Sequence, residues 1–365
     1  MAARPPAPPP DTTGSPNDQR AHHRTPTSID AIADGRSTGG RGATVRLWSD
    51  EIEAIRAEMA SLRSVMGEVD VLATGVGAMA DPLEEAAAHR AAVDAHTSTV
   101  ETSPLAEDRR IETPGGRLAL RVFQPEGRAR GVYLHFHGGG WFLGSPRMSE
   151  RSNEDLAHRH GLVVVSVDYR LAPEHPYPAA PDDCLAAATW LLDGGLAEFG
   201  FDTMLVGGES AGAHLALVTA LRLRDRLAAI DRVQGLNLVF GVFDANGTPS
   251  QFGNDGGPDL LSPRFCRLMV DLFTPGMGSE DRRLPDISPV NADLTGLPST
   301  LVSVGTGDHL LDDSLLLAAR MAATDSPVDL AVYPDAPHGF TLLPSAMATA
   351  HADRQAAWIE ARLDA

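Results

Sequence analysis

The sequence predicts an α/β protein with a mostly parallel central sheet that helices cover on both faces. Two observations point to this class: short runs of apolar residues that are typical of buried strands, and longer helical stretches that separate them. The expected strands cover residues 117–123, 131–136, 162–167, 204–206, 236–243, 300–304 and 328–332. The expected helices cover residues 148–160, 179–192, 211–228, 313–324 and 346–363. Because these strands have no polar face, both sides of the sheet must be buried, as they are in parallel sheets with crossover helices.

The composition excludes several classes of function. The chain has 365 residues, enough for one large or two ordinary domains, and a formal net charge of −19. All 30 basic residues are arginine, which excludes Schiff-base chemistry, pyridoxal-phosphate attachment and lysine-based phosphate loops. The acidic excess argues against a nucleic-acid partner. Cys184 and Cys266 stand far apart, so we expect two buried thiols and neither a disulfide framework nor a zinc site.

The N-terminal part of the chain has two regions of different composition. Residues 1–46 are rich in Pro, Gly, Ser, Thr and Asp and are expected to form a disordered extension. Residues 47–104 are expected to form helices, the first of them behind the N-cap residue Ser49 and the second over residues 82–96. The apolar positions that predict the first helix are Ile52, Ile55, Met59, Leu62 and Met66. No apolar run is long enough for a signal peptide or a membrane span, so we expect a cytoplasmic protein.

The remaining residues, 105–365, carry the alternating strands and helices and are expected to form one domain. Residues from about 245 to 293 interrupt this alternation with many Gly and Pro residues and an apolar patch at 265–273. An insertion of this length between two strands is more often a lid or a binding element than an idle loop.

The sharpest motif is Gly208-Glu209-Ser210-Ala211-Gly212, between a predicted strand and a predicted helix. A nucleophile on a tight strand-to-helix turn needs small neighbours, and the turn presents its oxygen at the carboxyl edge of the sheet. The N–H of Ala211 lies at the positive end of the helix dipole, where it can face a developing oxyanion. A glycine-rich helix start with a capping serine is the alternative interpretation.

A second motif, His137-Gly138-Gly139-Gly140, follows the predicted strand 131–136. Successive glycines leave backbone N–H groups uncovered and permit positive φ, as an anion-binding nest requires. Gly139 and Gly140 are therefore expected to supply two further oxyanion donors. A phosphate loop or a simple turn is the alternative. His137 is expected to be a structural hydrogen-bonding residue rather than a catalyst.

A serine nucleophile needs a base to take its proton and an acid to hold that base in one tautomer. Asp308 follows the predicted strand 300–304, and His338 follows the strand 328–332. The chain order Ser210, Asp308, His338 is the one expected for this architecture. Asp312 and Asp313 are rival acids that are expected instead to cap the next helix. The other rivals are Asp335, which is too near His338 in sequence, and His309 as an alternative base.

These motifs, taken in order, resemble the hormone-sensitive-lipase-like esterases, the bacterial family IV of carboxylesterases on an α/β-hydrolase fold. The matching blocks are 137–140, 168–174, 208–212, 288–289 with Asp308, and 338–340. The resemblance implies a helical cap built from residues 47–104 and from the insertion at 245–293. It also implies hydrolysis of small esters with short to medium acyl chains, without a metal or an organic cofactor. Glu209 stands where the family commonly has Asp, which is expected to alter how the turn is braced.

Three other functions stay open at this point. An amide- or lactone-directed hydrolase, such as a deacetylase or formamidase, would use the same residues. A non-catalytic receptor on the same fold would lack the base, whereas His338 is present. An interfacial lipase would need a large apolar lid. The oligomeric state is open as well, and a homodimer is one expectation.

Overall fold

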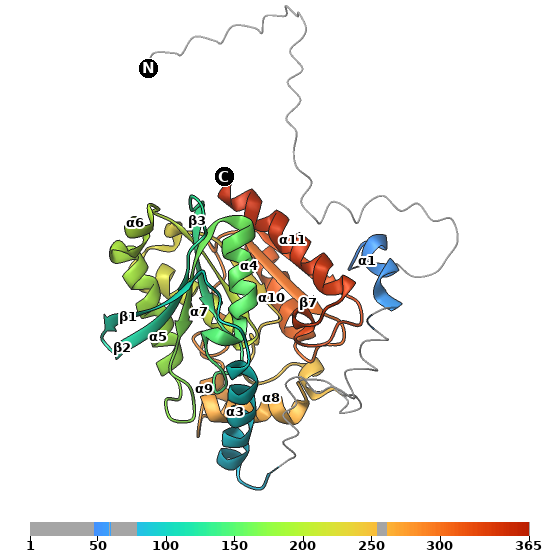
Figure 1. Ribbon diagram of the computed structural model, residues 1–365. Helices are drawn as coiled ribbons and strands as arrows, with labels where there is room; N and C mark the ends of the chain where they lie inside the picture. The colour runs from blue at the N-terminus through green and yellow to red at the C-terminus, as the bar shows by residue number, and fades with distance from the viewer. Residues whose placement is uncertain (1–46, 58, 60–78, 254–260, 365) are drawn as a thin grey trace, which may run out of the picture. The chain divides into compact units, whose positions relative to one another are not determined.

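The computed structural model describes residues 47–57, 59, 79–253 and 261–364, so the predicted extension 1–46 lies outside the described residues. A central sheet lies between the helices (Figure 1). It has eight strands in the spatial order β1-β2-β4-β3-β5-β6-β7-β8. In chain order the strands are β1 (Ala106–Thr113), β2 (Gly116–Phe123), β3 (Gly131–Phe136), β4 (Leu162–Asp168), β5 (Met204–Glu209), β6 (Val233–Val239), β7 (Thr300–Gly305) and β8 (Val328–Tyr333). From β4 to β8 all neighbouring pairs are parallel, and β2 pairs antiparallel with both β1 and β4. The prediction of a mostly parallel sheet is confirmed.

Helices cover both faces of this sheet. They are α1 (Asp50–Ala54), α3 (Pro82–Ser98), α4 (Glu150–His160), α5 (Ala179–Trp190), α6 (Leu196–Phe199), α7 (Ala211–Leu227), α8 (Pro263–Phe273), α9 (Ser279–Arg282), α10 (Leu311–Ala323) and α11 (Ala346–Leu363). Successive residues of a strand point to opposite faces of the sheet. Val164 of β4 packs in one cluster with Leu156 of α4 and Ile359 of α11. The next residue, Val165, packs in the other cluster with Leu215 of α7. The two buried faces explain why the strands read as continuous apolar runs.

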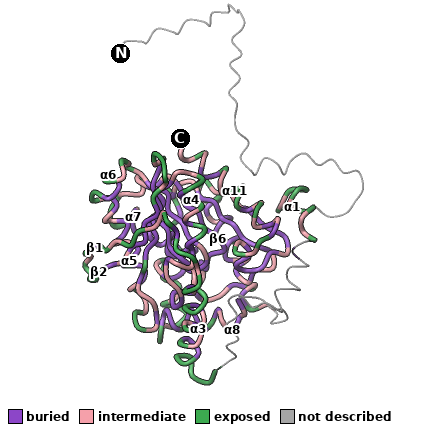
Figure 2. The backbone as a smooth tube through the Cα atoms, in the orientation of Figure 1, coloured by how far each residue is buried: buried purple, intermediate pink, exposed green. Residues whose placement is uncertain are grey.

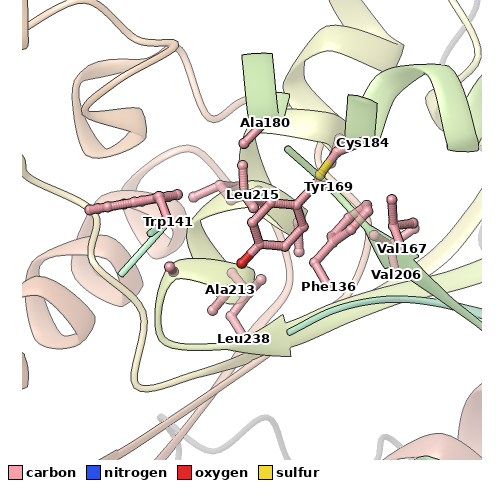
Figure 3. Packing of buried hydrophobic residues seen from close by; sticks show 14 of the residues in the cluster. Phe136, Trp141, Val167, Tyr169, Ala180, Cys184, Val206, Ala213, Leu215 and Leu238 are labelled. Atoms are coloured by element: carbon pink, nitrogen blue, oxygen red, sulfur yellow. The ribbon is translucent and has the colours of Figure 1, made fainter. Parts of the chain in front are cut away.

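The two cysteines lie in the second of these clusters. Both are free thiols and both are buried, as predicted. Figure 3 shows Cys184 of α5 and Leu215 of α7 beside the buried ring of Tyr169. The cysteines therefore contribute apolar packing.

Two strands differ most from the prediction, and a third, β5, continues to Glu209 beyond the predicted end at residue 206. No sequence pattern predicts β1, because its eight residues are mostly charged and it is an exposed edge strand (Figure 2). The strand expected over residues 236–243 ends instead at Val239, because Phe240 takes a positive φ of 38° and turns the chain away. This turn matters for the site, because it directs the ring of Phe240 towards His338, 4.7 Å away between ring centroids.

The N-terminal helices dock on the domain through arginine contacts. Arg56 pairs with Asp335 at 2.6 Å, next to α1. On α3, Arg90 donates to the carbonyl oxygens of Phe142 and Ala172 and pairs with Glu174. The predicted helix over 82–96 is confirmed as α3. The first predicted helix is described only in part, as α1 and the helical residues 56–57 and 59, and Leu62 and Met66 lie outside the described residues.

The insertion that begins near residue 245 contains short helices and one longer amphipathic helix, α8. Residues 254–260 lie outside the described part. The described short elements are 3-10 turns at Pro249–Phe252 (η5) and Pro289–Asn291 (η6), and α9. Helix α8 contacts α3 through the ion pair between Arg264 and Glu85. The apolar patch predicted at 265–273 is thus the buried face of a helix. In the described part of the chain, no helix has both the length and the apolar character to span a membrane.

Candidate active site

The turn between β5 and α7 holds Ser210 in a strained conformation. Its φ and ψ are 56° and −120°, and its N–H donates to the carbonyl oxygen of Val239 at 2.9 Å. The flanking glycines are required by contact: a Cβ on Gly208 or on Gly212 would collide with the carbonyl oxygen of Phe136. The serine side chain is therefore presented at the carboxyl edge of the sheet, as the motif predicts.

A chain of hydrogen bonds joins the three residues predicted to act together. Ser210 Oγ lies 3.1 Å from His338 Nε2, and His338 Nδ1 lies 2.9 Å from Asp308 Oδ2. Because a carboxylate only accepts, the imidazole proton sits on Nδ1, and Nε2 is free to accept from the serine hydroxyl. The N–H of Leu310 donates to the other oxygen of Asp308 at 2.8 Å, so both carboxylate oxygens are fixed. All three side chains lie after parallel strands, at one edge of the sheet.

The rival acids and base have other partners. Asp335 pairs with Arg56, and His309 Nδ1 donates to the carbonyl oxygen of Ser250 at 3.0 Å. The predicted capping role of Asp312 and Asp313 is wrong: the N-cap residue of α10 is Leu310, whose side chain makes no capping hydrogen bond. Both carboxylates accept instead from the segment that follows β6, because that segment packs across the first turn of α10.

The glycine loop after β3 has the backbone that the motif predicts. The φ angles of Gly139, Gly140 and Trp141 are 113°, 58° and 63°. The carbonyl oxygen of Gly139 accepts from Leu143 N at 2.8 Å, which closes the loop. The backbone hydrogen bonds of the described turns and loops leave the N–H groups of Gly139, Gly140 and Ala211 without an acceptor. Those groups are available to a bound oxyanion.

His137 has a buried structural setting. Its ring stacks on Tyr169 at 4.2 Å between centroids, and its Nδ1 lies 2.7 Å from the carbonyl oxygen of Gly138. The hydroxyl of Tyr169 donates to the carbonyl oxygen of His137 at 2.7 Å. Burial lowers the pKa of His137 to about 3, so the ring is neutral at ordinary pH. These contacts fix the start of the glycine loop.

Glu209, next to Ser210 in the chain, contacts a buried polar network that the sequence does not predict. His135 Nε2 lies 3.1 Å from a Glu209 carboxylate oxygen. On the other side of the ring, Nδ1 lies 2.8 Å from Ser166 Oγ and 3.3 Å from Asn153 Nδ2, both of which can donate to it. His135 therefore donates to Glu209 through Nε2. The sequence signal for this network is a histidine next to the last residue of an apolar strand.

A cavity of about 290 Å³ opens onto Ser210 and His338. The glycine loop and Phe240 line this cavity. Apolar side chains from α3, the insertion and α8 also line it; these are Val93, Leu261, Phe265 and Met269. Further lining residues come from α4 and α11. The sequence predicts the candidate reacting groups but not these lining residues, because the positions of the lining residues depend on how distant segments pack.

Comparison with known proteins places this chain in a family. Residues 133–342, more than half of the chain, match the family model described as the alpha/beta hydrolase fold. The carboxylesterase NlhH of Mycobacterium tuberculosis is 34% identical over 222 residues, which cover 57% of this chain and 66% of that protein, just under two thirds of its length. The acetyl esterase of Salmonella typhi is 30% identical over 235 residues, which cover 63% of this chain and 71% of that protein.

A solved structure described as a hormone-sensitive lipase from a metagenome library is 30% identical, with a TM-score of 0.68, and the match covers 84% of this chain and 98% of that one. This likeness confirms the resemblance that the ordered motifs predict. The chain belongs to the α/β-hydrolase fold family, with hormone-sensitive-lipase-like esterases among its relatives.

Proposed function

We propose that this protein is a serine carboxylesterase that hydrolyses small esters with short to medium acyl chains. One observation carries the proposal: Ser210, His338 and Asp308 form an unbroken hydrogen-bonded chain that opens into a cavity, beside backbone N–H groups that have no acceptor among the described residues. The family relatives named as a carboxylesterase and an acetyl esterase support the same reaction.

The first half of the reaction transfers the acyl group to the serine. His338 Nε2 takes the hydroxyl proton as Ser210 Oγ attacks the ester carbonyl carbon. The negative charge that develops on the carbonyl oxygen is stabilised by the N–H groups of Gly139, Gly140 and Ala211. The tetrahedral intermediate then expels the alcohol oxygen, which receives the proton from His338, and an acyl-serine remains.

The second half returns the enzyme to its starting state. Water gives a proton to His338 Nε2 and attacks the acyl carbon, again with the oxyanion held by the loop and the start of α7. The carbon–oxygen bond to Ser210 breaks, Oγ takes the proton back, and the carboxylic acid leaves. Throughout, Asp308 holds the Nδ1 proton and stabilises the imidazolium.

We further propose that residues 47–104 and the insertion at about 245–293 act as the cap of this site. Val93 comes from the first region and Phe265 and Met269 from the second, and all three line the cavity. A volume of about 290 Å³ lies at the small end of ligand pockets, which favours small acyl and alcohol groups. A cytoplasmic location and a homodimer stay predictions.

A substrate series tests the proposed reaction. We expect purified protein to hydrolyse p-nitrophenyl acetate and butyrate with a higher kcat/KM than the laurate ester, because long chains exceed the cavity. Matched anilides and lactones serve as the amide and lactone arms. A higher kcat/KM for an anilide or a lactone than for every ester would contradict the carboxylesterase assignment.

The glycine loop gives a second prediction. Gly139→Ala is expected to lower kcat by about 10²–10³, because a Cβ would collide with the carbonyl oxygen of Leu143 and displace the oxyanion donors. Gly116→Ala is the matched control: Gly116 has a similar φ of 108°, but an added Cβ meets nothing within 4 Å. Steady-state kinetics with p-nitrophenyl butyrate and thermal melting of both variants measure the two effects. Equal losses of kcat would show that the loop geometry is not used in the reaction.

A further inference from the structure

One buried carboxylate, that of Asp313, accepts four hydrogen bonds from the segment that follows β6. The N–H groups of Phe243 and Asp244 donate to Oδ1 at 2.7 and 2.9 Å. The side chains of Thr248 and Gln251 donate to Oδ2 at 2.8 and 2.7 Å. Asp313 is 0% exposed. All four donors belong to the same segment. Their hydrogen bonds to this buried carboxylate therefore fix that segment against α10.

The chemistry of this contact requires a carboxylate. Burial raises the pKa of Asp313 to about 6, and the hydrogen bonds from Gln251, Asp244 and Phe243 oppose the rise. The group is therefore ionised at neutral pH and above. Asparagine has almost the same shape, but its NH₂ group would face donors on one side, so it cannot replace the contact.

A second set of hydrogen bonds joins the same two segments beside Asp313. Ser250 N donates to Asp312 Oδ2 at 2.8 Å, and Asp312 N donates to Ser250 Oγ at 3.0 Å. Ser250 Oγ in turn donates to the carbonyl oxygen of His309 at 2.9 Å. We call these bonds, together with the four to Asp313, the α10 clamp.

The α10 clamp lies next to the proposed catalytic acid. The loop between β7 and α10 carries Asp308, whose carbonyl oxygen accepts from Leu311 N at 3.1 Å and whose carboxylate accepts from Leu310 N. Asp308 is thus joined to the first turn of α10, and a shift of that turn moves its carboxylate relative to His338. On the other side, the clamped segment begins just after Phe240, whose ring packs on His338.

We propose that Asp313 is a positioning residue for the reaction. It holds the loop that carries Asp308 in a fixed position relative to the segment that follows β6. The inference rests on the proposed function of Ser210, His338 and Asp308. Asp313 acts through Asp308 and touches no reacting atom. A carboxylate that served only global stability would change melting but not the turnover of correctly folded sites.

A double-mutant cycle separates these two roles. Asp313→Asn is expected to lower kcat per titrated serine about 10- to 100-fold, the scale of a misplacement of a catalytic group by about 1 Å. The KM for p-nitrophenyl butyrate should change much less. In an Asp308→Asn background the same substitution should change kcat less than about threefold, because the group through which it acts is already lost. Active sites are counted with a fluorophosphonate burst, so unfolded protein does not enter kcat.

Two further variants make the test specific. Asp325→Asn removes the same charge from an exposed residue with a φ of 58°, a conformation that asparagine accepts, and should leave kcat unchanged. Ser250→Ala opens the α10 clamp from the opposite segment without any change of charge. Like Asp313→Asn, it should lower kcat, and this effect should be lost in the Asp308→Asn background. If Asp313→Asn does not fold, Ser250→Ala carries the test.

The possible results distinguish a failure of this inference from a failure of the proposed function. The second-order rate of fluorophosphonate labelling at Ser210 follows the same cycle without an ester substrate. Wild-type protein that labels but hydrolyses no ester contradicts the proposed function, while the labelling rates still test Asp313. The inference would be overturned if Asp313→Asn lowered kcat by the same factor in the Asp308→Asn background as in the wild type. It would also be overturned if kcat per titrated site were unchanged in Asp313→Asn. Wild-type protein that neither labels nor hydrolyses overturns both.

Discussion

Ser210→Ala is expected to lower kcat for p-nitrophenyl butyrate by about 10⁴–10⁶, because the acyl-enzyme can no longer form. The activity that survives would come from the oxyanion donors and from substrate binding alone. The backbone strain at φ 56° is the same for both residues, since serine and alanine both carry a Cβ. The variant should therefore fold as the wild type does, and its loss should be a loss of chemistry.

The measurement is steady-state hydrolysis with thermal melting as a check of folding. Ser303→Ala is the matched control, because Ser303 in β7 is buried and its hydroxyl has no hydrogen-bond partner among the described residues. It should keep the wild-type kcat. Retention of more than a trace of activity in Ser210→Ala would show that another residue is the nucleophile.

Asp308→Asn is expected to lower kcat by about 10⁴, because an amide cannot accept from both Leu310 N–H and His338 Nδ1–H. With its NH₂ group towards the ring, the amide would stabilise the tautomer that carries the proton on Nε2. That tautomer cannot accept the serine proton. The effect should appear in kcat more than in KM, since Asp308 does not contact the ester.

Asp312→Asn provides the comparison, because Asp312 was the neighbouring rival for the acid. Its carboxylate accepts one bond, from Ser250 N, and does not reach the imidazole. We expect its loss in kcat to stay within about tenfold, from a weakened α10 clamp. Equal losses in the two variants would mean that Asp308 is not the acid of the site.

The placement of the candidate reacting groups could be predicted from the sequence, because local backbone rules decide it. Ser210 stands on a turn that only small neighbours permit, and Asp308 and His338 follow parallel strands whose carboxyl ends meet at one edge. Most strand and helix limits were also predictable from apolar runs. Helix α11 begins at Ala346 and ends at Leu363, as predicted from its sequence pattern.

The supporting residues could not be predicted, because long-range packing decides their roles. Asp313 has the sequence position of an ordinary helix cap, and only the approach of the segment after β6 makes it the centre of the α10 clamp. In the sequence, His135 is a single polar residue in an apolar strand, and its role is visible only once the structure places Glu209 beside it. Strand β1 was missed for another reason: an exposed edge strand needs few apolar residues.

Covalent labelling tests the central claim most directly. Native protein is treated with a fluorophosphonate, digested, and mapped by mass spectrometry, with Ser210→Ala in parallel. Activation of one serine by His338 predicts a single adduct on Ser210, loss of hydrolysis in proportion to labelling, and no adduct in the variant. Rapid labelling of any other residue, or full hydrolysis after Ser210 is modified, would contradict the account.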